Sequence, residues 1–437
     1  MRRIRYLLAP LRSRDFTLVW LGQGISQIGD RCTEIALVWL LVGLTGSSVL
    51  MGAVLSAMYI PTLLLLLVGG VIADRGSRRA VILACDGLRA LAITVFAVLA
   101  TLGMISLPTV FVLAAFYGII AAFFNPALRA LYPSLVSPEQ YDAANSLQQI
   151  VLQVALLGGP ALGGYLIAQW NVGVALAVDA LTFVIAFLTL LLTRRGAFQL
   201  PEQDQKLTQG GNARRHWQEI FAGIRFLKGE VGILSLIVFF SLTNGLNNVE
   251  AVLVPRLVRE ELDLPAIAFG LLASAMGVGT LLGALATGLL AGRVRRRAQV
   301  ICISIMVFGA AIIAMGLAET ALLLDVSYLV LGLSFIVPEV VFMSLLQHVI
   351  PAEMRGRVFS VLSLIAMAMN PLGLMLAGVL GDSFGTRAGL WIGGGVIVAL
   401  SVLVLALPTV RALNRRDVAL SMSTPEASGE MTVPTGA

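Results

Sequence analysis

Charged residues are scarce in this sequence. Lys, Arg, Asp and Glu make up 12% of its 437 residues and hydrophobic residues make up 58%, whereas roughly a quarter of an average soluble protein is charged. So little charge, with a mean hydropathy of +0.93, excludes a fold that is surrounded by water and makes the bilayer the solvent. Because hydrocarbon contains no water to satisfy a lone backbone group, only helices or a closed barrel can span it. The apolar runs are about twenty residues long, which predicts helices.

Cysteine and histidine are also rare, with three and two copies. Cys32, Cys85 and Cys302 lie inside apolar runs without metal-ligand spacing, and their odd number does not suit a disulfide framework. We interpret them as packing residues. The sequence also lacks a phosphate-binding glycine loop with its lysine and a Ser/His/Asp arrangement on a soluble domain. We therefore expect no enzymatic activity, no metal site and no cofactor.

Twelve apolar segments of helical length follow one another along the chain. They lie at roughly 16–43, 48–70, 80–101, 108–130, 143–168, 171–193, 231–257, 267–291, 298–318, 326–349, 358–380 and 387–408. The predicted fold is an all-α integral membrane protein with twelve transmembrane helices in two pseudo-symmetric six-helix bundles. The expected domains are an N-terminal bundle (1–193), a cytoplasmic linker with an amphipathic helix (194–230), a C-terminal bundle (231–410) and a disordered cytoplasmic tail (411–437).

Positive charges between the spans predict the orientation. Of the 30 Lys and Arg residues, 25 lie in the N-terminal tail and in every second connection after it, and only Arg256, Arg259 and Arg387 lie in the others. By the positive-inside rule both termini are cytoplasmic in a multi-pass protein of the inner (plasma) membrane. No cleavage site follows the basic N-terminus, so we do not interpret it as a signal peptide. The same rule explains the pI of about 9.6, and we expect a monomer without nucleic-acid partners.

The two halves carry matching segments after their second spans. GVIADRGSRRA (70–80) set beside GLLAGRVRRRA (288–298) aligns a glycine, an alanine and three arginines. A second match, between 136–145 and 349–358, is weaker and retains only a proline and an acid. Together the matches indicate duplicated halves related by an axis along the membrane normal. Such an arrangement places a substrate site between the halves near the midplane.

These features resemble the major facilitator superfamily of transporters. The loop between helices two and three resembles the family's signature G-x-x-x-D-R-x-G-x-R-R through Gly70, Asp74, Arg75, Gly76, Arg78 and Arg79, with the last three one position earlier than in that pattern. GGPALGG in span five is similar to the G-P-x-x-G-G core of the family's exporters, through Gly159, Pro160, Gly163 and Gly164. WLGQGISQIGD, FFNPALRALYPSLV and PAEMRGRVFS look most like the bacterial drug:proton antiporter branch that includes macrolide and siderophore exporters. In one departure, YGIIAAFFNP lacks the arginine that better-studied drug exporters carry within helix four.

The acid in the loop signature predicts a contact beyond the loop itself. Exposed ion pairs contribute only about 0–1 kcal/mol, too little to explain one carboxylate among three arginines. We expect Asp74 to lie near the start of span eleven, with Arg355 and Arg357, because a helix N-terminus attracts a carboxylate. The resemblance implies the same contact, a cytoplasmic latch that joins the halves when the transporter faces outward. The alternative is a loop that only sets topology, but the second copy has Gly292 in place of Asp74, which favours the latch.

Charges inside the bilayer cost at least ~2.5 kcal/mol each and are therefore functional candidates. Asp30 and Glu34 lie one turn apart in span one, and Arg31 is close enough to neutralise Glu34. Glu339 follows Pro338 about midway through span ten. Our proton-coupling candidates are Asp30, Glu34 and Glu339. The alternative is that these acids belong to ion pairs that hold helices together.

Other polar residues are candidates for the wall of a cavity. The set comprises Arg31 in span one, Gln149 and Gln153 in span five, and Asn244, Asn247 and Asn248 in span seven. Asp86 and Arg89 in span three are three residues apart, which predicts a structural ion pair.

The function that we favour is secondary active transport. The protein would export amphiphilic small molecules of the drug or siderophore type by proton antiport with alternating access, so its partners would be the substrate, protons and the lipid bilayer. One alternative is a lipid or lysolipid flippase on the same scaffold, because a cavity with few charges suits acyl chains. Another is a transport-inactive membrane sensor or subunit, in which the buried acids would have a cost and no use.

Overall fold

The described part of the chain is helical throughout. The computed structural model describes residues 2–75, 77–194, 222, 224–227, 229–290 and 296–412, apart from the side chains of 2–4, 67, 71, 73–75 and 352. Within these residues there is no strand. The predicted amphipathic helix is described only near its end, where Leu227 is buried, and Trp217 and Ile220 lie outside the described residues. Residues 413–437, most of the predicted tail, also lie outside them.

Six long helices make up most of the first half, and two short segments precede them. The short ones are α1 (Arg2–Leu7) and the 3-10 turn η1 (Ala9–Arg12). The long ones are α2 (Arg14–Leu44), α3 (Ser48–Arg75), α4 (Arg78–Thr101), α5 (Leu107–Ser134), α6 (Tyr141–Gln169) and α7 (Val172–Leu191), with the turn η2 (Pro138–Gln140) before α6.

The second half also has six long helices. They are α10 (Val231–Arg256), continued by the π-helical turn η4 (Leu257–Glu261), α11 (Ala266–Leu289), α12 (Arg297–Gly316), α13 (Ala321–Val349), α14 (Ala352–Phe384) and α15 (Thr386–Ala406). The prediction of twelve spans is confirmed. The largest difference is α14, which extends beyond the predicted 358–380 at both ends.

Local signals set several helix ends. Ser77, Asn171 and Thr320 begin α4, α7 and α13 by accepting a hydrogen bond from the backbone N–H three residues later, which satisfies a donor that the helix leaves unpaired. Between α14 and α15 the chain turns at Gly385, whose φ of 86° suits glycine because it has no Cβ.

Eleven of the twelve long helices in the described residues are apolar enough to cross a membrane. The exception is α2, in which Asp30, Arg31 and Glu34 lower the hydropathy. Its 31 residues nevertheless extend about 45 Å, and it packs beside α6 and α7. The protein is therefore a multi-pass membrane protein, and the charges of α2 lie within the bundle.

The helix packing of the first half is repeated in the second. In the first half α2 contacts α6 and α7, α3 contacts α5, and α4 contacts α5 and α7. In the second half α10 contacts α14 and α15, α11 contacts α13, and α12 contacts α13 and α15. Each pair has its counterpart six helices later, as duplicated halves require.

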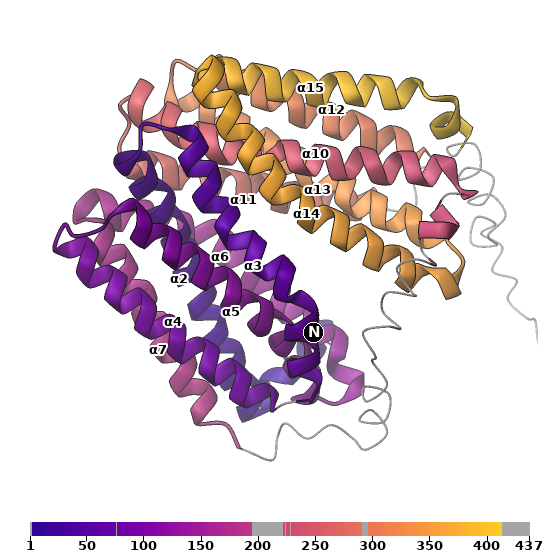
Figure 1. The fold of residues 1–437 in the computed structure, drawn as a ribbon. Coiled ribbons are helices and arrows are strands. Elements are labelled where there is room, and N and C mark those ends of the chain that lie inside the picture. The colour runs from indigo at the N-terminus through magenta and orange to yellow at the C-terminus, as the bar shows by residue number, and fades with distance from the viewer. Residues whose placement is uncertain are drawn as a thin grey trace, which may run out of the picture.

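The two halves meet along two helix pairs, α3 with α14 and α6 with α11. We call the end where α2 begins and α15 ends the terminal end, and the opposite one the far end. In Figure 1 the bundles lie together at the far end and diverge toward the terminal end, where N is marked. In the α6–α11 contact a Cβ on Gly164 would lie 2.6 Å from the carbonyl oxygen of Ala266, and Gly164 also faces Gly270. The backbones are in direct contact there.

This contact predicts an effect on stability. Gly164→Leu should lower the free energy of unfolding by about 1–3 kcal/mol, since the added atoms overpack the interface between the halves. Gly158→Leu on the same helix is the control, because a Cβ there meets nothing within 4 Å. The thermal unfolding midpoints of both purified variants would check this, and equal midpoints would contradict it.

Candidate functional site

A cavity of about 660 Å³ lies between the halves and is lined mainly by the first. Its wall comprises residues of α2 to α6, with Asn248 and Ala251 of α10 and Leu374 of α14. Its size is within the range of small-molecule sites. The wall extends from Arg129 and Gln148, near the terminal end, to Val38.

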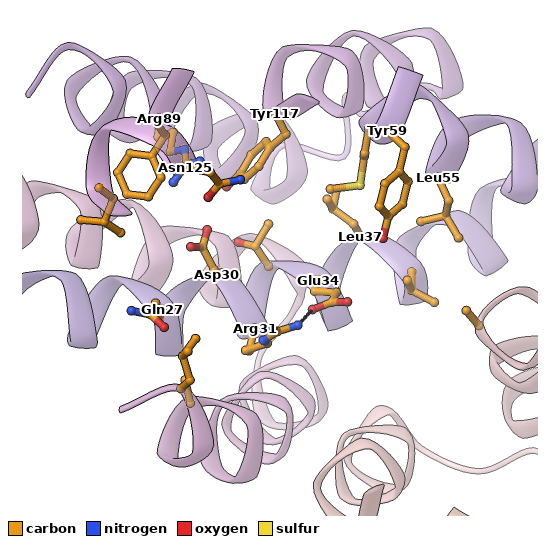
Figure 2. Close-up of a pocket in the computed structure, with 18 of the residues that line it drawn as sticks. Gln27, Asp30, Arg31, Glu34, Leu37, Leu55, Tyr59, Arg89, Tyr117 and Asn125 are labelled. Carbon is orange, nitrogen blue, oxygen red and sulfur yellow. Dashed lines mark hydrogen bonds and ion pairs between the residues drawn. The ribbon is translucent and has the colours of Figure 1, made fainter. Parts of the chain in front are cut away.

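Three charges of α2 lie in this wall, as Figure 2 shows. Arg31 Nη1 is 2.7 Å from Glu34 Oε2, and the two side chains are 40% and 57% exposed. Asp30 lies one turn before Glu34. In Figure 2 it points toward Tyr117 and Arg89.

The predicted ion pair between Asp86 and Arg89 is wrong. Asp86 instead accepts a hydrogen bond of 2.8 Å from Gln23 Nε2. The Arg89 guanidinium lies over the rings of Phe124, Phe183 and Tyr117, at 4.2, 5.5 and 5.8 Å from their centroids. Because these rings belong to α5 and α7, the arginine packs across the bundle, and it lies beyond ion-pair distance of the acid on its own helix.

A fully buried acid, Asp179 of α7, lies behind the cavity wall. It accepts hydrogen bonds from the hydroxyl groups of Thr33 (2.6 Å), Thr182 (3.0 Å) and Tyr117 (3.4 Å). Tyr117 also lines the cavity. Asp179 therefore joins α2, α5 and α7, and its hydrogen bonds connect it to the cavity through two hydroxyl groups, because Thr33 is also part of the wall.

Glu339 lies in a different place from Asp30. It lines a second pocket, of about 30 Å³, inside the second half. The other lining residues are Phe240, Thr243, Asn244, Asn247, Ile305, Phe308, Ser334, Phe335 and Pro338. The structure thus brings Glu339 together with Asn244 and Asn247, and keeps it apart from Asp30 and Glu34.

The other predicted wall residues are divided. Gln149 and Asn248 line the large cavity, and Asn248 also donates to Asn370 Oδ1 at 3.2 Å. The side-chain oxygen of Gln153 is buried without a hydrogen-bond partner.

The GGPALGG segment lies in helix contacts outside the cavity wall. Positions 159 and 163 pack on α2 against Arg31 and Cys32. Pro160 and Gly164 pack on α11.

At the far end one carboxylate joins the halves. Asp382, near the end of α14, accepts hydrogen bonds from the Ser47 hydroxyl (2.5 Å) and from the backbone N–H groups of Ser48 (2.6 Å) and Val49 (3.1 Å), where α3 begins. Arg256 of α10 binds it at 3.3 Å and donates to the Ser48 hydroxyl at 2.5 Å. A carboxylate at a helix N-terminus is stabilised by the unpaired N–H groups and the helix dipole. We call these residues the far-end gate.

A second arginine reinforces this end. Arg259, in η4 of the second half, donates to the carbonyl oxygen of Trp39 at 2.5 Å and lies 4.9 Å from its ring centroid. Guanidinium groups bind in this way to aromatic faces. Both contacts join the halves.

The predicted gate at the terminal end is only partly described. The side chains of Asp74 and Arg75, and Gly76 as a whole, lie outside the described residues, and a Cβ on Gly70 would meet nothing within 4 Å. Arg78 and Arg79 donate to carbonyl groups of their own half, Ala130 and Leu191, both at 2.9 Å.

On the second-half side of this gate, Arg355 and Arg357 also donate hydrogen bonds to residues nearby in the sequence. Arg355 donates to Ile350 at 3.1 Å, and Arg357 donates to Met354 at 3.4 Å.

Sequence reasoning missed Tyr117 and the far-end gate. Tyr117 and Phe124 are seven residues apart, which places them on one helix face, but other aromatic residues of the span hide that signal. Asp382 stands beyond the predicted end of its span, so its position in the sequence does not mark it as an intramembrane charge. Arg256 and Arg259 contribute in the sequence only to the charge asymmetry that predicts the orientation.

The comparisons with known proteins agree with this fold. Macrolide efflux protein A of Streptococcus pyogenes is 26% identical over 406 residues, which cover 91% of this chain and 97% of the relative. Multidrug efflux pump Tap of Mycolicibacterium fortuitum is 28% identical over 394 residues, covering 88% and 94%. The crystal structure of the nucleoside transporter NupG aligns with a TM-score of 0.70 at 14% identity, covering 89% of this chain and 98% of that one.

Two bundles of six helices around a central cavity define a transporter of the major facilitator type. The model of the transmembrane secretion effector family matches residues 6–436, so the chain belongs to that family. Because the relatives are transporters, the protein at family level moves small molecules across a membrane and is not an enzyme.

The far-end gate generates a prediction about access. Asp382→Asn should weaken the gate by about 1–2 kcal/mol, since the lost hydrogen bonds were to an ionised group. In an Ala251→Cys background, labelling by an impermeant maleimide added at the far end should then rise roughly tenfold. Ala251 lines the cavity and the three native cysteines are buried.

The control for this experiment is Glu260→Gln. Glu260 binds Arg256 at 3.0 Å but belongs to the same half, so its loss leaves the halves joined. If both variants gave equal labelling, Asp382 would not hold this end closed.

Proposed function

We propose that the protein exports amphiphilic small molecules by proton antiport with alternating access. The observation that carries the proposal is the cavity of about 660 Å³ between two bundles that are joined at one end. The relatives named for macrolide and multidrug efflux support the substrate class. The predicted orientation, with cytoplasmic termini in the inner (plasma) membrane, would place the far-end gate outside the cell.

Alternating access would use both ends of the α3–α14 pair. The two helices are antiparallel neighbours, so the end of each lies beside the start of the other. At the far end, Asp382 on α14 occupies the N-terminus of α3. Asp74 stands in the last turn of α3 and α14 begins at Ala352, so the same device is available at the terminal end. Exchange of one carboxylate contact for the other would open one side and close the other.

Asp74→Asn tests this exchange. The variant should express and fold nearly as well as the wild type but lose most transport, because the outward-facing state loses its latch. Labelling of a Gln149→Cys reporter, in the cavity wall near the terminal end, should rise.

The control for the latch is Asp142→Asn, which removes an exposed acid at the same end of the same half. If Asp74→Asn kept the transport flux and the labelling of the wild type, the loop would only set the topology and would not act as a latch.

Proton coupling requires acids that can exchange protons during the cycle. Glu34 is bound to Arg31, which leaves Asp30 in the large cavity and Glu339 in the second pocket as the titrating pair. The second pocket lies between three phenylalanine rings and two asparagines, and no cation is among its lining residues. One acid in each half suits a cycle in which the halves move relative to each other.

Glu339→Gln and Asp30→Asn should separate transport from its driving force. Each variant keeps hydrogen-bonding capacity and loses the proton site, so substrate should still exchange down its own gradient. Accumulation in liposomes driven by an imposed pH gradient should vanish. Asp325→Asn on the same helix as Glu339, outside the pocket, is the control. Continued accumulation by both variants would refute coupling through these acids.

The flippase alternative fits the cavity less well. Its wall carries five charged side chains, those of Asp30, Arg31, Glu34, Arg89 and Arg129, and charged walls are poor hosts for acyl chains. A panel of macrolides, siderophores and lysolipids in proteoliposomes, with and without a pH gradient, distinguishes these substrate classes.

A further inference from the structure

Arg89 is a buried arginine without a carboxylate within ion-pair distance among the described residues. Its side chain is 5% exposed, and its Nε has no hydrogen-bond partner. The remaining part of the guanidinium reaches the wall of the large cavity. An arginine within a membrane span is costly and normally pairs inside the bundle. The neutral rings around it lower this cost but do not neutralise its charge.

The acid on its own helix is already engaged. Asp86 lies one turn before Arg89, and its Oδ2 accepts the bond from Gln23, while its Oδ1 is buried without a hydrogen-bond partner and lies beyond ion-pair distance of Arg89. The rings of Phe124 and Phe183 hold the guanidinium in its cavity-facing position. The cation is therefore held at the cavity wall without an ion-pair partner among the described residues.

We propose that Arg89 is the positioning partner of Asp30 and that the two groups pair when the Asp30 carboxylate is ionised. Both line the same cavity, and Figure 2 shows the Asp30 carboxylate directed toward the side that carries Arg89, Tyr117 and Asn125. The inference rests on the proposed proton antiport, in which Asp30 exchanges a proton.

The neighbouring cation does not replace Arg89 in this role. Arg31, next to Asp30 in the chain, is held by Glu34 at 2.7 Å. The groups that face Asp30 are Arg31 and Glu34 of α2, Asp86 and Arg89 of α4, Tyr117 of α5 and Asp179 of α7. Among these groups Arg89 is the cation without a carboxylate of its own. Protonation of Asp30 would release Arg89, and loss of the proton would bring the pair together.

Two double-mutant cycles test the pairing without any substrate. One combines Asp30→Asn with Arg89→Gln, and the other combines Asp86→Asn with Arg89→Gln, each measured by the thermal unfolding midpoint of the purified full-length protein. We expect Arg89→Gln to cost clearly less in the Asp30→Asn background than in the wild type, because contacting residues are not additive. In the Asp86 cycle the coupling should be smaller, because Asp86 is bonded to Gln23 and makes no ion pair with Arg89. If the coupling between Arg89 and Asp30 is no larger than the coupling between Arg89 and Asp86, the proposal is overturned.

The pH profile separates positioning from a structural role. Stability is measured against pH for the wild type and for Asp30→Asn. The inflection that the wild-type curve shows and the Asp30→Asn curve lacks reports the titration of Asp30. In Arg89→Gln that inflection should move to higher pH by about one unit or more, because an adjacent cation no longer opposes protonation. Arg129→Gln, which removes an exposed arginine of the same wall, should leave it in place. An unmoved inflection in Arg89→Gln overturns the proposal.

Arg89→Lys keeps the test decisive if the glutamine variant does not fold. It retains the charge, so it should fold. Its inflection should move from the wild-type pH by less than about half as far as the inflection of Arg89→Gln. A lysine variant whose curve matches that of Asp30→Asn would also overturn the proposal. Failure of wild-type vesicles to accumulate substrate under a pH gradient would instead refute the proton antiport, and the stability data would still decide the pairing.

Discussion

Acids buried in a bilayer must find their hydrogen-bond donors within the protein, and this constraint organises the polar interior of the molecule. Asp179 accepts hydrogen bonds from three hydroxyl groups on three helices. Asp86 accepts one from the amide of Gln23, and Glu250 accepts one from the hydroxyl of Tyr328 at 2.7 Å. Asp382 accepts a hydrogen bond from the backbone N–H of Ser48 at the N-terminus of α3. Apart from the bond from Thr182 to Asp179 within α7, each of these bonds crosses from one helix to another, because a spanning helix has already used its own backbone groups. The acids therefore determine which helices stay together.

The two halves share a packing pattern but differ in chemistry. The wall supplied by the first half contains five charged residues. The smaller pocket of the second half contains one acid among amides and aromatic rings. Duplication thus preserved the apolar contacts that hold each bundle together, whereas the central polar groups of the two halves diverged. Under the proposed function, such divergence would let one scaffold hold an ion site and a site for an apolar group in different halves.

The fold could be predicted from the sequence because it depends on long apolar runs, and α3 or α13 can be recognised by length alone. Much of the site could not, because it depends on which faces of different helices meet. The spacing of Asp86 and Arg89 favoured a pair, yet Arg89 packs against rings on α5 and α7. Glu339 and Asp30 both lie in mid-span, and nothing in the sequence shows that they lie in separate pockets. Asp382 could be recognised only once its helix was known to lie beside the start of α3.

The contacts between the halves are made largely by backbone at glycine. A Cβ on Gly52 of α3 would meet the carbonyl oxygen of Leu374, and one on Gly378 of α14 would meet that of Ser48 at 2.7 Å. Surfaces of this kind carry few interdigitated side chains, so the helices can part without waiting for rotamers to change. In the proposed alternating-access cycle, the activation barrier for separation would then be concentrated in a few directed hydrogen bonds at the helix end. Turnover would accordingly be sensitive to single polar substitutions there and tolerant of changes in the lipid-facing side chains.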